Sequence, residues 1–186
     1  MKKLFLSVLL ILVAALSASG QRTSKGQFYV GADWGTTVYP KLMSYHVIGV
    51  EAGQYLLFGR WEAGVQYSSR DAYGIVSVLA RAGGMYRFCA SRNRVVNFYG
   101  GGDLIMGADF CSEQISVLIP DDDGTSKTEV KEAKTGFVWG LNPKLELEIF
   151  PFTRMAFYLG ASFPVKFSTQ QKAFSIVPYA GIRVNL

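Results

Sequence analysis

Eight segments of the chain show apolar residues alternating with polar or small ones at a period of two. In the first, Phe28, Val30 and Trp34 stand on one side of the alternation and Asp33 on the other. A period of two places alternate side chains on opposite faces of a β-strand. The sequence therefore predicts eight strands, each with one apolar face, at residues 28–34, 48–53, 60–67, 76–88, 96–106, 137–149, 155–165 and 174–186.

Such alternation also fits a water-soluble sandwich, in which the apolar faces form the core. Three features favour the inverse arrangement. None of the apolar-face positions is charged, and the opposite faces are rich in Gly, Ser, Tyr and Asn with isolated charges of both signs. Several strands are also long, and a tilted membrane strand needs about 9–11 residues whereas soluble strands average about 5–6. Only a closed barrel satisfies the backbone of strands in lipid, so we expect an all-β fold, an eight-stranded antiparallel up-and-down transmembrane β-barrel.

The segments between the predicted strands alternate in length. With the N-terminus on the periplasmic side, the second, fourth and sixth gaps become short periplasmic turns, and the remaining gaps face outward. The longest gap, residues 107–136, is one of the outward ones and contains the run Pro120-Asp121-Asp122-Asp123-Gly124. Short periplasmic turns and longer extracellular loops are typical of outer-membrane barrels. We expect residues 107–136 to form a mobile loop outside the cell.

The N-terminus has the layout of a secretory signal peptide. Lys2 and Lys3 precede an apolar stretch, which ends in small residues at Gly20. The stretch is shorter than the roughly 20 residues that a spanning helix needs. We therefore expect residues 1–20 to be a signal peptide cleaved after Gly20, residues 21–186 to be a single barrel domain, and the bacterial outer membrane to be the location.

Composition narrows the function classes. The 186 residues are 49% hydrophobic and 14% aromatic, which excludes a disordered chain and favours strands. The formal net charge is +5, and two of the 19 Lys and Arg residues lie in the predicted leader. The remaining surplus of positive charge is too small to indicate a nucleic-acid partner, and we expect no direct contact with nucleic acid.

Charged residues fall on the predicted inner faces as six acids and six bases. An eight-stranded barrel is just wide enough for side chains to fill it, and an unpaired buried charge is costly. We expect these charges to pair in a structural network that plugs the barrel; a channel for small solutes is the alternative. The predicted inner charges are Asp33, Glu51, Glu62, Asp103, Glu146, Glu148, Arg60, Arg81, Arg87, Lys144, Lys166 and Arg183.

Residues able to carry catalysis or bind metal are few. The single histidine, His46, has Ser44 and Glu51 as its nearest candidate partners, and only its position at the outer mouth suggests a site. We expect no catalytic, cofactor or metal site and no enzymatic activity. Cys89 and Cys111 lie at opposite ends of neighbouring predicted strands, too far apart for the approach of about 7 Å between Cα atoms that a disulfide needs.

Two prolines conflict with the strands that contain them. Pro143 and Pro178 lie on apolar faces, and each removes a hydrogen-bond donor from the ladder. Either a bulge shifts the register there, or those strands are shorter than the alternation indicates.

The final part of the last predicted strand, residues 179–186, is apolar at every second position and ends on Leu186. It resembles the C-terminal strand signal that the outer-membrane barrel assembly machinery reads. This resemblance implies that the machinery is a partner during biogenesis, and membrane lipid is the expected surrounding.

Five segments together carry a further resemblance: the leader end at residues 19–22, the strand end at 83–88, Asn97 with the glycines at 100–101, residues 143–146 and the closing 181–186. With them the chain resembles the conjugal transfer protein TraO family, which is encoded on conjugative transposons. The resemblance implies a structural component of a conjugative transfer apparatus, with other apparatus proteins as partners, and no active site. The alternatives are a general small barrel for adhesion or envelope integrity and, more distantly, a lipid-A-modifying enzyme.

Overall fold

A computed structural model describes residues 25–39, 45–70, 75–91, 95–111, 115–120, 126–131, 135–152, 154–167 and 174–186. These residues form strands and no α-helix, and none of them belongs to a helix that could cross a membrane. The predicted signal peptide, residues 1–20, lies outside the described residues.

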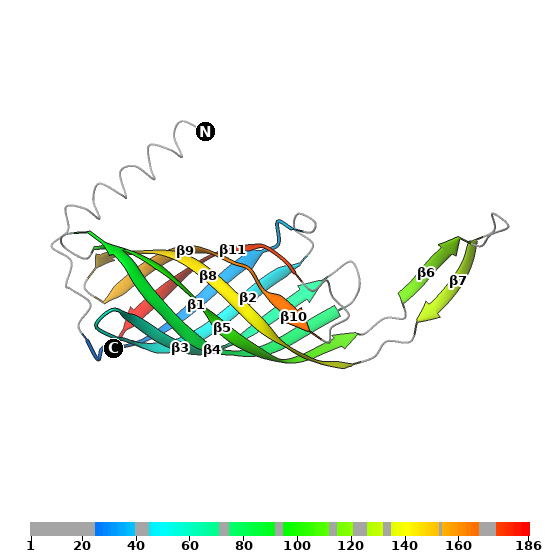
Figure 1. The fold of residues 1–186 in the computed structure, drawn as a ribbon, viewed down its shortest axis with the longest axis horizontal. Helices are drawn as coiled ribbons and strands as arrows, with labels where there is room; N and C mark the ends of the chain where they lie inside the picture. The colour runs from blue at the N-terminus through cyan, green and yellow to red at the C-terminus, as the bar shows by residue number, and fades with distance from the viewer. Residues whose placement is uncertain are drawn as a thin grey trace, which may run out of the picture.

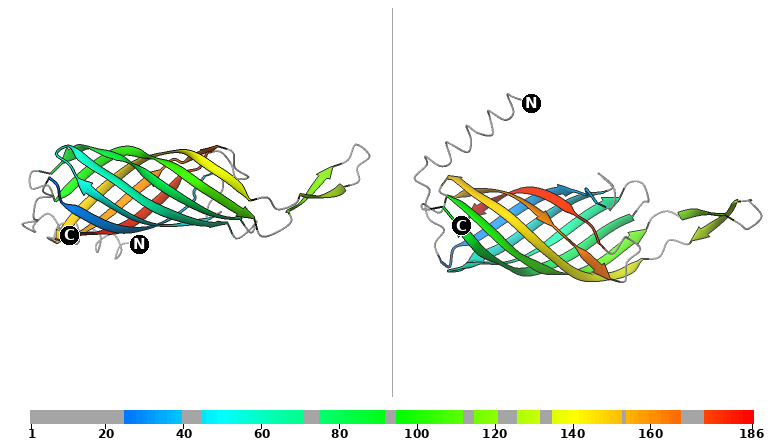
Figure 2. Two further views of the ribbon diagram at one scale, coloured as in Figure 1. Left: turned by 90° about the horizontal axis from the view of Figure 1, so that it is seen from below. Right: turned by 45° about the horizontal axis from the view of Figure 1, so that its top comes forward.

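The strands close into one antiparallel barrel (Figures 1 and 2). Going round the wall the order is β1-β2-β3-β4-β5-β8-β9-β11, and β11 pairs back with β1. The short strand β10 continues β9 and also pairs with β8, so β9 and β10 together form one of the eight strands. The bounds are β1 (Phe28–Thr36), β2 (His46–Tyr55), β3 (Gly59–Arg70), β4 (Ile75–Ala90), β5 (Val96–Cys111), β8 (Gly136–Phe152), β9 (Met155–Ser162), β10 (Val165–Phe167) and β11 (Val177–Asn185). The predicted eight-stranded antiparallel barrel is confirmed.

The two ends of the barrel differ in the lengths of their connections. At one end the turns are short, at residues 56–58, 91–95 and 153–154. The start of β1 and the end of β11 lie there, where the backbone N–H of Leu186 donates to the carbonyl of Phe28 over 2.9 Å. The other end carries the longer connections. We refer to these as the short-turn end and the long-loop end.

The barrel wall is inverted relative to a soluble protein. Leu104, Leu159 and Phe137 point outward and are 58–64% exposed, whereas the charged residues on the opposite faces are buried. Aromatic side chains are exposed on the outer wall at many positions, including Trp34, Trp61, Tyr67, Tyr86, Phe88, Phe137, Trp139, Phe157 and Phe174. The outer surface is therefore the apolar one, as the alternation predicts.

The longest predicted loop, residues 107–136, is largely built of strands. β5 continues to Cys111 and β8 begins at Gly136. Between them, β6 (Ile115–Pro120) and β7 (Ser126–Lys131) pair as a separate hairpin that lies beyond the long-loop end (Figure 1). Past residue 107, β5 continues through Gly107, Ala108 and Asp109, where the hydrophobic signal is weak. β6 and β7 pair with each other and not with the barrel wall. The prediction that this whole segment is a loop is wrong.

Pro143 lies within a continuous β8, with no shift in the β8–β5 register. Its carbonyl accepts a hydrogen bond from Phe163 over 2.9 Å, so its missing N–H faces the same side, where the ladder is interrupted between β9 and β10. The neighbouring strand thus accommodates the proline. Neither a bulge nor an early end of β8 is needed.

At Pro178 the strand pairing does shift. Tyr179 pairs with Gly35, whereas Ile176 pairs with Tyr39. Three steps from Ile176 to Tyr179 therefore match four from Gly35 to Tyr39, which is the geometry of a bulge in the segment that follows β1. β11 itself begins only at Val177, so this strand is also shorter than the predicted 174–186.

The interior is packed in successive layers. Aromatic residues around Tyr29, Tyr55 and Phe150 fill the short-turn end. Charged residues occupy the middle, and an apolar cluster of Leu79, Ile105 and Val138 lies next to them toward the long-loop end. Inward-facing glycines make room for these side chains: a Cβ on Gly181 would lie 2.3 Å from the ring of Tyr158, and one on Gly49 would lie 2.6 Å from a carboxylate oxygen of Asp33.

Candidate functional site

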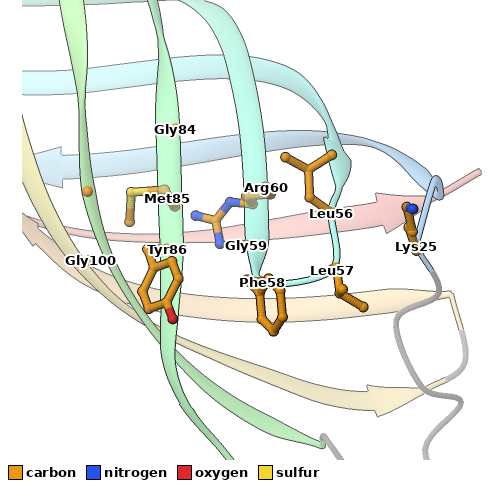
Figure 3. Close-up of a pocket in the computed structure, with 11 residues that line it drawn as sticks. Lys25, Leu56, Leu57, Phe58, Gly59, Arg60, Gly84, Met85, Tyr86 and Gly100 are labelled. Atoms are coloured by element: carbon orange, nitrogen blue, oxygen red, sulfur yellow. The ribbon is translucent and has the colours of Figure 1, made fainter.

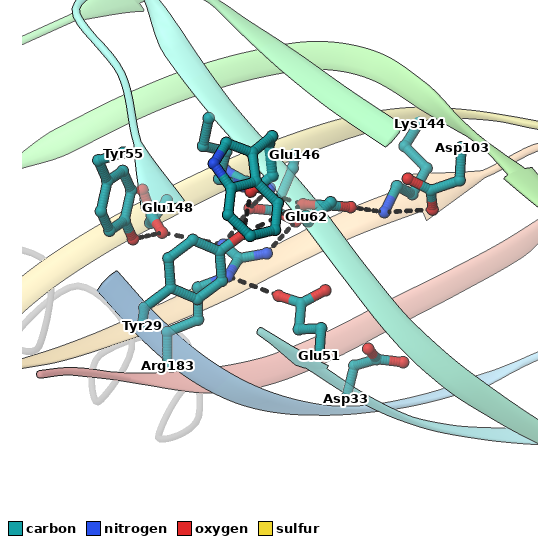
Figure 4. Close-up of polar contacts among 12 residues, drawn as sticks. Tyr29, Asp33, Glu51, Tyr55, Glu62, Asp103, Lys144, Glu146, Glu148 and Arg183 are labelled. Atoms are coloured by element: carbon teal, nitrogen blue, oxygen red, sulfur yellow. Dashed lines mark hydrogen bonds and ion pairs between the residues drawn. The ribbon is translucent and has the colours of Figure 1, made fainter. Parts of the chain in front are cut away.

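The polar centre of the molecule is a network of charged side chains inside the barrel (Figure 4). Its hub is Arg183 on β11, which has no exposed surface. The guanidinium donates through Nε to Glu51 over 2.7 Å, and through Nη1 and Nη2 to the two oxygens of Glu146 over 2.6 and 3.0 Å. Nη1 also reaches Glu148 over 2.9 Å. Paired N–H groups on one carboxylate are the strongest arrangement that an arginine makes.

A second branch leads from Glu146 toward β3 and β5. Arg60 Nη2 lies 2.8 Å from Glu146, and Arg60 Nε lies 3.0 Å from Glu62. Glu62 in turn pairs with Lys144, whose Nζ is 2.8 Å from Asp103. All of these side chains are buried, so each charge has its partner in place of water.

A third branch connects β4 with β1 and β2. The guanidinium of Arg81 pairs with Asp33 and lies 3.0 Å from Glu51. Because Glu51 also pairs with Arg183, the three branches form one connected network of ten charged residues. Seven of the eight barrel strands supply a charged member, and β9 supplies Tyr158, whose ring lies 3.8 Å from Arg183. The network therefore links the whole circumference of the barrel.

Tyrosines complete the coordination of the carboxylates. The Tyr55 hydroxyl donates to Glu148 over 2.7 Å, and the Tyr179 hydroxyl donates to Glu146 over 3.2 Å. The guanidinium of Arg60 lies 4.5 Å from the ring of Tyr99. Sequence reasoning did not include these tyrosines, although the inward positions of Tyr99 and Tyr158 follow from the same alternation.

Most of the predicted inner charges meet in this network: Glu51, Arg60, Glu62, Arg81, Asp103, Lys144, Glu146, Glu148, Arg183 and Asp33. Arg87 does not. It is half-buried at the short-turn end, where its guanidinium donates to the carbonyl of Leu57 over 2.8 Å. Lys166 is buried nearer the long-loop end, as is Asp109, which the sequence had placed in a loop. The network thus has six acids and four bases, because two of the six bases predicted to face inward, Arg87 and Lys166, lie outside it.

The barrel wall separates His46 from Glu51, its candidate acid partner. His46 is exposed on the outer face and stacks on Trp34, with ring centroids 5.9 Å apart, whereas Glu51 points into the barrel. Ser44 lies outside the described residues. Cys89 is an exposed free thiol. Within the described ranges, no group of three or more His, Cys, Asp and Glu side chains could hold a metal.

The arrangement cross-links the strands of the barrel. Ion pairs fill the barrel's middle section and packed aromatic and apolar clusters lie on either side, so the interior contains a cross-linked core. An eight-stranded barrel has no room for an aqueous pore once its side chains meet in the centre. What remains available for recognition is the outer wall and the two ends.

Solved structures of the same architecture are known. Neisserial surface protein A aligns with a TM-score of 0.58 and 15% identity, over 86% of this chain and 97% of that one. The N-terminal β-barrel domain of Pseudomonas aeruginosa OprF aligns with a TM-score of 0.56 and 12% identity, over 87% and 98%. No family model and no curated protein matches the sequence. The likeness shows the fold, that of the small eight-stranded outer-membrane barrels.

Proposed function

We propose that this chain resides in the bacterial outer membrane and acts there by contact, without conducting solutes and without catalysis. The apolar outer wall supports the membrane location, because a closed barrel satisfies its backbone in lipid and turns its apolar side chains outward. The short-turn end faces the periplasm in this proposal, and the β6–β7 hairpin faces outward.

The observation that carries the contact role is the ten-residue ion network. It joins side chains from around the whole barrel and leaves them buried, so neither DNA nor protein could pass through the interior. A protein of this form can serve a larger assembly as a scaffold or an anchor.

We further propose that the assembly is a conjugative transfer apparatus. The support is the resemblance of the segments at residues 83–88, 143–146 and 181–186 to the TraO family. Other proteins of the apparatus are then its partners, and the barrel assembly machinery inserts it. The surface offered to those partners outside the cell is the segment that carries β6 and β7, because function concentrates in segments held by a rigid scaffold.

Deletion of the gene from a donor strain tests the proposal, with mating frequency as the readout and the wild-type gene supplied in trans as the control. A loss of mating that the wild-type gene restores is expected. Unchanged mating would refute the transfer role and favour a general envelope barrel.

A second variant locates the contact. Replacing residues 112–133 with a short Gly/Ser linker should leave the barrel folded, because shortening a loop changes closure entropy little. Folding is checked by the shift in gel mobility between heated and unheated samples. Lost mating with a folded barrel assigns the contact to this segment, whereas full mating assigns it to the barrel wall or the periplasmic turns.

A further inference from the structure

A hollow of about 570 Å³ lies on the outside of the barrel at the short-turn end (Figure 3). The turn that joins β2 to β3 forms one side with Leu56, Leu57 and Phe58, and Tyr86 of β4 forms another. Lys25 lies at its edge. We call this hollow the rim groove. Its lining is mostly apolar. Arg60 contributes to it but is buried and paired with Glu62 and Glu146, so Lys25 is its exposed cation.

The groove exists because outward positions of β4 and β5 carry no side chain. Gly84 pairs with Trp61 on one side and Gly102 on the other, in a row that faces outward. A Cβ on Gly84 would meet only the carbonyl oxygen of Arg60 at 3.7 Å, so the space above it is open. A second hollow of about 300 Å³ lies beside it and shares Gly101 with the first.

Two hydrogen bonds from Arg87 hold one side of the rim groove in place. Arg87 fixes the β2–β3 turn twice: its backbone N–H donates to Phe58 over 2.8 Å and its guanidinium donates to Leu57 over 2.8 Å. Arg87, which lies outside the interior network, thus positions the wall of the rim groove. A fixed wall lowers the entropic cost of binding a flexible ligand.

Lys25 is also positioned by the strands beside it. The next residue, Gly26, donates its N–H to Tyr55 over 2.8 Å and accepts from the side chain of Gln54 over 3.0 Å. The lysine therefore stands at the edge of the barrel, where an apolar hollow meets the level of the short turns. An apolar slot with a cation at its outer end is complementary to an anionic head joined to a hydrocarbon chain.

We propose that the rim groove binds one anionic phospholipid of the membrane leaflet next to the short turns, with an acyl chain along Gly84 and the phosphate beside Lys25. This inference rests on the proposed membrane location. A lipid fits better than a protein segment, because the groove opens onto the same outer wall that the hydrocarbon surrounds and its exposed cation, Lys25, lies at the short-turn end, where the headgroups of that leaflet would be.

The test uses protein extracted from outer membranes in folded form, with native mass spectrometry after addition of phosphatidylglycerol or phosphatidylcholine of identical chains. One lysine facing an anionic lipid surface corresponds to a preference of roughly fivefold for phosphatidylglycerol. Lys25→Gln should abolish the preference. The matched control is Arg154→Gln, which removes an exposed cation from the same end but away from the groove.

A second pair of variants tests the slot itself. Gly84→Leu should fill the groove and lower retention of both lipids, whereas Ala32→Leu, at an exposed outward position on β1, should not. Equal retention of the two lipids by the wild type, an unchanged preference in Lys25→Gln, or wild-type retention in a folded Gly84→Leu variant would each overturn the proposal.

The two proposals fail in different ways. A folded protein in the outer membrane that retains no phosphatidylglycerol removes the lipid site and leaves the location intact. Recovery of the protein outside the outer membrane refutes the proposed location.

Discussion

Removing the hub of the interior network should destabilise the barrel strongly. Arg183 is fully buried and donates to three carboxylates from two other strands, β2 and β8. In the variant Arg183→Met those carboxylates lose this partner, while Glu51 keeps Arg81 and Glu146 keeps Arg60. Breaking a buried ion pair costs about 3–5 kcal/mol, and the lost cation–π contact with Tyr158 adds about 0.5–2 kcal/mol. We expect a loss of about 3.5–7 kcal/mol in the free energy of unfolding.

The assay is reversible urea unfolding in lipid vesicles, followed by tryptophan fluorescence. Arg154→Met is the matched control, because this arginine is exposed at the short-turn end and its loss should change stability by no more than about 0.5 kcal/mol. Arg183→Lys keeps a charge but not the two-pronged contact with Glu146, so it should fall between wild type and Arg183→Met.

A double variant tests whether the cost arises from uncompensated charge. Adding Glu146→Gln to Arg183→Met removes one of the carboxylates left without this partner. The two changes together should therefore cost less than their sum by at least about 1 kcal/mol. If Arg183→Met unfolds at the same urea concentration as Arg154→Met, the network does not hold the barrel together and the reasoning is refuted.

Three further outcomes follow from the same geometry. Leu104→Arg places a charge on the outer wall at the middle of β5 and should cost about 2–4 kcal/mol, whereas Val38→Arg, near the long-loop end, should cost about 0–1 kcal/mol. Equal effects in vesicle unfolding would contradict the membrane orientation. Cys89 and Cys111 should both react as free thiols under denaturing, non-reducing conditions. Cys111 pairs with Ile75 at the far end of β4, about 46 Å along that strand from Cys89. A single intramolecular disulfide would disprove this register. Liposomes containing the protein should not swell in small sugars, since the ion network fills the interior, and swelling would restore the channel alternative.

The sequence by itself determined which side chains face inward. The pleat of a strand alternates side chains whatever its partners are, so the inward placement of Arg60, Glu62 and Asp103 could be predicted from local sequence. The alternation also predicted the number of barrel strands and the short turns at one end. It missed Asp109 because small and polar residues near that end of β5 weaken the hydrophobic signal.

Which inward residues meet one another was decided only by the tertiary structure. Arg183 and Glu51 are 132 positions apart, and they meet because closure of the barrel brings β11 beside β1 and β1 beside β2. The stagger between strands sets the height of each side chain along the axis, and it leaves Arg87 at the rim beside Leu57, outside the network. The break opposite Pro143 and the groove above Gly84 likewise depend on neighbouring strands. Alternation is a property of one strand, whereas contact depends on register and closure, which only the assembled barrel fixes.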